Sequence, residues 1–184
     1  MNKRFLTDKL CIVAFGIAIN IVCPFFAMNL RLPIYMDSVG TILITRLLGP
    51  VYGIMAGAGG SLISGITFDI YSLYYFPVQI FTASMTALAL KKGWLTGKKL
   101  LFGGIIISLP TAIVSAVITA FVFGGITAAG SSYFVVLLHS AGMNLTVSCF
   151  VVQLLTEYAD KSLAAFFTGK VTERGRMGAG YGKI

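Results

Sequence analysis

The sequence predicts an all-α membrane protein, a compact bundle of six transmembrane helices with both termini in the cytoplasm. Of its 184 residues, 57% are hydrophobic and only 11% are charged, and the mean hydropathy is +0.91. A soluble domain of this length needs more charged residues to cover its surface. A helix needs roughly 20 apolar residues to cross about 30 Å of hydrocarbon, so the chain has room for about six spans joined by short loops.

We expect one helix for each long apolar run, in the order 10–28, 38–49, 51–67, 70–90, 100–124 and 133–160. The second and third runs are short, and Gly49-Pro50 between them predicts a turn or a kink. Pro77 and Pro110 should bend their helices or leave a carbonyl group free for another partner.

The third run is dense in small residues, which let helix backbones approach each other closely in lipid. Gly53 with Gly57, and Ala56 with Gly60, form two pairs of small residues four positions apart. We therefore expect this helix to pack tightly against its neighbours. A phosphate-binding loop is excluded, because no lysine-serine or lysine-threonine pair follows the glycines.

The basic residues predict the orientation of the bundle. With both ends inside, only Arg31 of the 14 basic residues lies outside, and the opposite orientation reverses that ratio. Basic residues placed between apolar spans indicate membrane topology and not a nucleic-acid partner. Residues 1–167 then form the membrane domain, and the basic, glycine-rich segment 168–184 is expected to be a loose cytoplasmic tail near anionic headgroups. The expected cytoplasmic residues are Lys3, Arg4, Lys9, Arg46, Lys91, Lys92, Lys98, Lys99, Lys161, Lys170, Arg174, Arg176 and Lys183.

Polar side chains inside apolar helices are candidate site residues, because burying them in lipid is costly. Three groups are expected to meet in the outer half of the bundle, where aromatic faces and a few polar groups suit a small, flat heteroaromatic ligand. The first lies on one stripe of the fourth helix, the second on the sixth helix, and the third in the first external loop. They are Tyr71, Tyr75 and Gln79; His139 and Asn144; and Arg31, Tyr35 and Asp37.

Each of these residues also has a structural interpretation. The tyrosines could form an interfacial aromatic belt. His139, Asn144 and Gln79 could join helices by hydrogen bonds. Arg31 and Asp37 could be a solvated loop pair. Asn20 and Gln153 are interpreted as packing residues.

Catalysis finds little support in the sequence. No serine lies in a GxSG turn, so His139 has no nucleophile to activate. With one histidine and no acidic pair expected inside the membrane, a metal site is not predicted either. Asp37 and Asp69 are expected near the outer edge, and Glu157 and Asp160 toward the cytoplasm, so an ion-coupled carrier is also disfavoured.

Three features resemble the substrate-binding S components of energy-coupling factor (ECF) vitamin transporters. The first helix contains Ala14-Phe-Gly-Ile-Ala18, similar to the small-residue motif with which these subunits dock onto their membrane partner. The segments Leu32-Pro-Ile-Tyr-Met-Asp-Ser-Val-Gly-Thr41 and Leu48-Gly-Pro-Val-Tyr-Gly53 resemble stretches common in the family. The chain also lacks an ATPase motif, as expected where partner subunits supply the energy. The resemblance covers roughly residues 5–167.

The resemblance implies a multi-pass protein of the bacterial cytoplasmic membrane that is not an enzyme. It would capture a vitamin outside with high affinity and close the first loop over it. It would then tip within the membrane when a transmembrane coupling subunit and two cytoplasmic ATPases act. ATP and magnesium would bind to those partners, and this chain would hold no cofactor or metal. Ala14 and Ala18 would form the docking face, with Arg31, Tyr35 and Asp37 in the lid and Tyr71, Tyr75, Gln79, His139 and Asn144 in the pocket.

Among the S components, the chain most resembles members assigned to hydroxymethylpyrimidine or pyridoxine. A small hydroxylated ring could stack on tyrosine and exchange hydrogen bonds with Gln79, His139 and Asn144. Niacin, riboflavin and thiamine remain open. Two other classes of function are alternatives: a structural or assembly subunit without a ligand, and a small autonomous carrier or channel.

Overall fold

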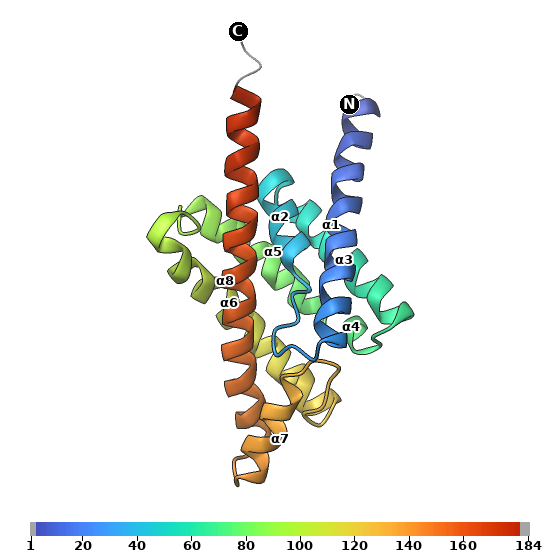
Figure 1. Cartoon of the computed structure of the whole chain (residues 1–184), viewed down its shortest axis with the longest axis vertical. Coiled ribbons are helices and arrows are strands. Elements are labelled where there is room, and N and C mark those ends of the chain that lie inside the picture. The colour runs from blue at the N-terminus through green and yellow to red at the C-terminus, as the bar shows by residue number, and fades with distance from the viewer. Residues whose placement is uncertain (1–2, 181–184) are drawn as a thin grey trace.

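The computed structural model describes residues 3–180, and the side chains of residues 6–173. Within these limits the chain consists of helices, turns and loops, without any strand (Figure 1). The elements are α1 (Lys3–Asn29), α2 (Val39–Leu48), α3 (Pro50–Thr67), α4 (Tyr71–Tyr74), α5 (Phe76–Lys91), the 3-10 helix η1 (Gly97–Lys99), α6 (Leu100–Val117), the π-helix η2 (Ile118–Val122), α7 (Ser132–Ser140) and α8 (Leu145–Gly180). The prediction of an all-helical fold is confirmed.

Two helical segments are each long and apolar enough to cross a membrane. They are Leu6–Asn29, within α1, and Gly97–Val122, which combines η1, α6 and η2. The apolar helix Val39–Leu48 is shorter; its 10 residues are about 15 Å long at 1.5 Å per residue. Among the described residues, the structure thus supports two spans by length and composition, fewer than the six expected.

Two of the expected long helices are each divided into two. The fourth is broken at Tyr75, next to Phe76-Pro77 at the start of α5, where proline lacks the N–H that a continuous helix requires. The sixth is broken between α7 and α8, where Gly142 has a φ of 94°. The segment expected as a loose tail, 168–184, is helical as far as it is described, because α8 continues to Gly180; residues 181–184 lie outside the described part of the chain.

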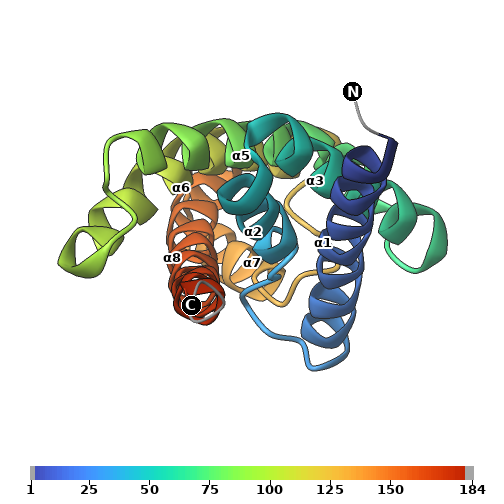
Figure 2. The ribbon, with the colours of Figure 1, turned by 90° about the horizontal axis from the view of Figure 1, so that it is seen from above.

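Helix α2 lies at the centre of the molecule. It packs against α1, α3, α5 and α8, and its residues from Gly40 to Thr45 are buried. Figure 2 shows α2 between α1 on one side and α8 on the other. The two chain ends point to the same end of the molecule, with α7 at the opposite end (Figure 1).

Small residues allow the central helices to approach closely, as the sequence predicted for α3. A methyl group added at Gly57 would lie 2.7 Å from the Gln79 Cβ atom. The closest approach to a backbone atom involves Gly40 of α2, where an added methyl group would lie 2.0 Å from the Gly16 carbonyl oxygen of α1. Because that neighbour is backbone, only glycine fits at position 40 unless the two helices separate.

Candidate functional site

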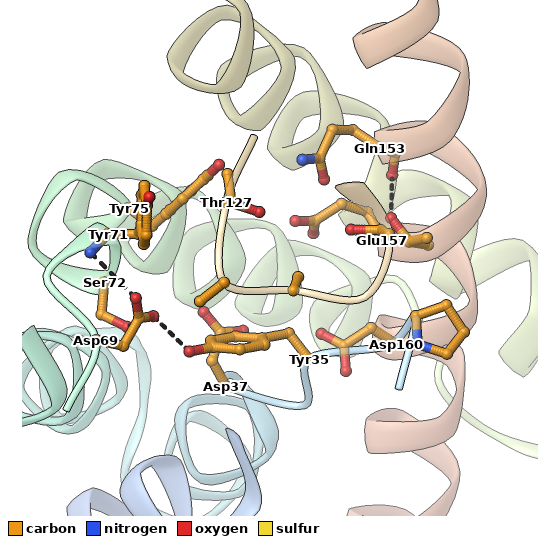
Figure 3. A pocket seen from close by; sticks show the side chains of 15 residues that line it. Tyr35, Asp37, Asp69, Tyr71, Ser72, Tyr75, Thr127, Gln153, Glu157 and Asp160 are labelled. Carbon is orange, nitrogen blue, oxygen red and sulfur yellow. Dashed lines mark hydrogen bonds between the residues drawn. The ribbon is translucent and has the colours of Figure 1, made fainter. Parts of the chain in front are cut away.

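A cavity of about 60 Å³ lies between the loop after α1, the start of α4 and α5, the loop before α7 and the middle of α8. One water molecule needs roughly 10–15 Å³ on this scale, so the cavity has room for several water-sized groups. Figure 3 shows side chains from all four regions around the same space. The lining residues are Pro33, Tyr35, Asp37, Asp69, Tyr71, Ser72, Tyr75, Thr127, Ala128, Ala129, Ser131, Gln153, Thr156, Glu157 and Asp160.

The cavity is strongly acidic in an otherwise basic chain. The chain has a net charge of +8 and only six acidic residues, yet four of them line this cavity: Asp37, Asp69, Glu157 and Asp160. None of the described lining residues is basic. Because chain segments far apart in sequence contribute these carboxylates, the fold itself concentrates negative charge here.

Lys161 neutralises part of this charge from beside the cavity. Its side chain is 1% exposed, and its Nζ atom lies 2.8 Å from Asp160, 3.0 Å from Glu157 and 3.8 Å from Asp37. A buried ammonium group needs such partners, since an isolated buried charge is very costly. One lysine among three carboxylates leaves an excess of negative charge at the cavity when all of the groups are ionised.

Two of these carboxylates are also held by neutral donors. The Ser38 hydroxyl donates a hydrogen bond to Asp160 Oδ2 at 3.1 Å. The Ser115 hydroxyl of α6 donates to Glu157 Oε1 at 2.9 Å. Asp160 is only 5% exposed, yet its other carboxylate oxygen, Oδ1, has no hydrogen-bond partner.

A buried chain of hydrogen bonds connects Asp37 to the packing of α1 and α2. Gln79 Nε2 donates to Asp37 Oδ2 at 2.9 Å, and the Thr41 hydroxyl donates to Gln79 Oε1 at 2.7 Å. Asn20 Nδ2 then donates to Thr41 Oγ1 at 2.9 Å, and the Gly40 N–H donates to Asn20 Oδ1 at 2.7 Å. Gln79 therefore positions Asp37 from behind and does not itself line the cavity.

Tyr35 closes the side of the cavity next to α4. Its hydroxyl donates a short hydrogen bond to Asp69 Oδ2, which also accepts a bond of 2.8 Å from the Ser72 hydroxyl. Burial, reinforced by the bond to Asp69, raises the pKa of the Tyr35 hydroxyl above its usual value. The phenol therefore remains protonated and can act as a donor.

A second aromatic wall comes from Tyr71 and Tyr75. The Tyr75 hydroxyl lies 2.6 Å from Thr119 Oγ1, and that oxygen accepts a 2.9 Å bond from Gln153 Nε2 of α8. The Tyr71 ring packs edge-on against Phe123, with 4.8 Å between ring centroids. Thr119 lies in the π-helical segment η2, so this irregular turn places a hydroxyl group between two lining residues.

Two loops meet over the cavity. The Gly130 N–H donates to the Leu32 carbonyl at 3.1 Å. A methyl group at position 130 would lie 2.3 Å from the Arg31 carbonyl oxygen, so the close contact requires glycine. In the first loop, Arg31 and Met36 have positive φ angles of 53° and 58°, which are unfavourable for side-chain-bearing residues.

The structure brings together only part of the set of residues predicted from sequence. Tyr35, Asp37, Tyr71 and Tyr75 line the cavity, and Gln79 contacts Asp37 directly behind it. The remaining three, Arg31, His139 and Asn144, are exposed and are not lining residues. The break between α7 and α8 explains the position of two of them: His139 bonds to the Met143 carbonyl, and Asn144 Oδ1 accepts from the Thr146 N–H at the start of α8.

Sequence reasoning missed the contribution of α8. Gln153, Glu157 and Asp160 line the cavity, whereas Gln153 was assigned to packing and the two acids to the cytoplasmic side. Lys161, expected in the cytoplasm, is buried with them. The signal that could have found them is the spacing of 153, 157 and 160, which places three polar side chains on one face of an apolar helix.

The residues expected to form the docking face can also be located in the structure. Ala14 and Ala18 are both exposed on α1, as a docking face requires. No cluster of three or more His, Cys, Asp or Glu residues suited to a metal ion occurs within the described part of the chain.

No known protein family, curated protein or solved structure matches the chain.

Proposed function

We propose that this chain is the substrate-binding S component of an ECF-type importer. In this proposal it captures a small heteroaromatic vitamin or vitamin precursor outside the cell, with hydroxymethylpyrimidine or pyridoxine favoured. The supporting observation is the tyrosine-walled acidic cavity, closed by the loop between α1 and α2. Aromatic faces combined with a few convergent polar groups are typical of small-molecule sites.

A six-span arrangement in the membrane is part of the proposal. Besides the two long apolar segments, large apolar side chains are exposed on several helices, including Phe15 (62%), Ile66 (72%) and Leu155 (66%). Monomeric soluble proteins rarely expose extended apolar surfaces of this kind. Helix α2 is short for a full crossing, but its neighbours α1, α3, α5 and α8 shield it from surrounding lipid.

The orientation follows from the positions of the remaining basic residues. With Lys161 assigned to the bundle interior, the other basic residues still divide unequally, and only Arg31 lies on the side of the cavity loop. We place that loop outside the cell and the two chain ends inside. The cavity would then receive its ligand from the outside.

The proposed partners are a transmembrane coupling subunit and two cytoplasmic ATPases, which would supply ATP hydrolysis. Ala14 and Ala18 are small and exposed on α1, so a partner helix can approach the α1 backbone closely there. This surface is separate from the cavity-lining residues. Docking and ligand binding can therefore be tested independently.

Calorimetry on the purified full-length chain tests the proposal. The titrants are a vitamin panel that includes hydroxymethylpyrimidine, pyridoxine, thiamine, riboflavin and niacin. We expect saturable binding of at least one member at a ratio of one to one. A failure of every member to bind would favour a structural subunit, and ligand uptake into liposomes without ATPase partners would favour an autonomous carrier.

A further inference from the structure

The charge balance of the cavity narrows the class of ligand that it can bind. Four carboxylates line it, and none of the described lining residues is basic. The nearby Lys161 offsets at most one of these charges. A ligand that carries a carboxylate or phosphate would bring a further negative charge into this poorly solvated space, where like charges repel strongly.

A second observation identifies where a ligand could bind. Asp160 is 5% exposed, yet its Oδ1 atom has no hydrogen-bond partner, which is uncommon for a buried carboxylate oxygen. Glu157, which lines the cavity beside it, has the Lys161 ammonium 3.0 Å from its Oε2 atom, so Asp160 Oδ1 is the acceptor left without a partner. Figure 3 shows both carboxyl groups directed from α8 toward the space between the loops.

The geometry points to a nitrogen heteroaromatic ligand that presents an N–H-rich or positively charged edge to Asp160 and Glu157. An amino group next to a ring nitrogen, as in an aminopyrimidine, is one such edge, and a quaternised or protonated ring is another. The aromatic rings of Tyr71 and Tyr75 on the opposite wall suit the flat face of the same ligand. This inference rests on the proposed function, because it takes the cavity as the ligand site.

Matched ligand pairs test the inference on the purified full-length chain. The first pair is 4-amino-5-hydroxymethyl-2-methylpyrimidine and its 4-oxo analogue, which differ in the donor edge. The second pair is nicotinamide and nicotinic acid, which differ in negative charge. We expect the amino compound to bind about 10- to 100-fold more tightly than the oxo analogue, the range for one hydrogen bond to a charged group. Nicotinic acid should bind more weakly than nicotinamide.

Two cavity variants then locate the interaction. Asp160→Asn and Glu157→Gln each remove one charge while keeping the shape of the side chain. Each should weaken binding of the amino compound by at least about 10-fold and reduce its preference over the oxo analogue. Glu173→Gln is the control, because Glu173 is an exposed acid on the same helix away from the cavity. If Asp160→Asn does not fold, Glu157→Gln keeps the test decisive.

The outcomes separate this inference from the proposed function. Tight binding of nicotinic acid, or equal affinity for the amino and oxo compounds, would overturn the inference and leave vitamin capture standing. Unchanged affinity in both cavity variants would also overturn it. A chain that binds neither pair nor any vitamin would overturn the proposed function and this inference together.

Discussion

The buried lysine of α8 gives the sharpest test of how the cavity is stabilised. Lys161→Met keeps most of the side-chain volume but removes the ammonium group that lies within 4.0 Å of three carboxylates. Removing one partner of a buried ion pair typically costs about 3–5 kcal/mol, because the remaining charge is left uncompensated. The structure favours the lower end, about 3 kcal/mol, because Asp37, Glu157 and Asp160 each retain one neutral donor.

Thermal unfolding in detergent measures this loss. For a chain of 150–250 residues, 1 kcal/mol corresponds to about 2–4 °C, so Lys161→Met should lower Tm by about 6–12 °C. Lys170→Met is the matched control, because Lys170 lies on the same helix but is exposed. Adding Asp160→Asn to Lys161→Met should cost less than the sum of the two single changes, since the second change removes the uncompensated charge.

Two results would refute this reasoning. The first is a Tm for Lys161→Met that matches that of the Lys170→Met control. The second is strict additivity of the two changes at Lys161 and Asp160, because partners 2.8 Å apart must show coupling if their charges interact.

Five further changes test separate parts of the structure. Gly40→Ala should destabilise the protein by about 1–3 kcal/mol in the same unfolding assay, because the added methyl group meets the backbone of α1. Gly169→Ala should instead stabilise the protein by about 0.5–1 kcal/mol, because a methyl group has room at this position of α8. Tyr35→Phe removes the bond to Asp69 and should raise the ligand dissociation rate in stopped-flow measurements, by about 5-fold or more; an unchanged rate would show that Tyr35 does not hold the loop closed. His139→Ala should leave ligand affinity unchanged in calorimetry, because His139 is exposed and its ring bonds to the nearby Met143 carbonyl. A 10-fold loss of affinity would show that His139 does contribute to the site. Ala14→Leu should abolish ATP-dependent uptake with the full set of partners while ligand affinity is retained, and a loss of affinity would contradict a docking role.

The sequence predicted best those elements whose limits depend on local chemistry. Gly49 and Pro50 correctly divide α2 from α3, and the small residues of α3 correctly indicate close packing. The break at Tyr75 was not predicted, because the apolar pattern continues across it and only Pro77 signals a disturbance. The break before α8 was also missed, although Gly142 and Asn144, which caps the start of α8, are local signals of it.

The candidate site could be predicted only in part, because its charges pair across long distances in sequence. Tyr71 and Tyr75 were identified from a polar stripe on one predicted helix, and Tyr35 and Asp37 from the first external loop. Lys161 was misplaced because basic residues were assigned to the cytoplasm as a class. Nothing local to Lys161 shows that Asp37, which is far away along the chain, lies 3.8 Å from it.

The contact between Gly130 and Leu32 also has a consequence for the rate at which a ligand can reach the interior. A backbone hydrogen bond joins the two loops, which approach so closely that a methyl group at Gly130 would lie 2.3 Å from the Arg31 carbonyl oxygen. Separating the loops breaks that bond, whichever of them moves, so entry between them needs an opening step. If the cavity is the ligand site, as proposed, association and escape both include this step, and both should be slower than diffusion allows.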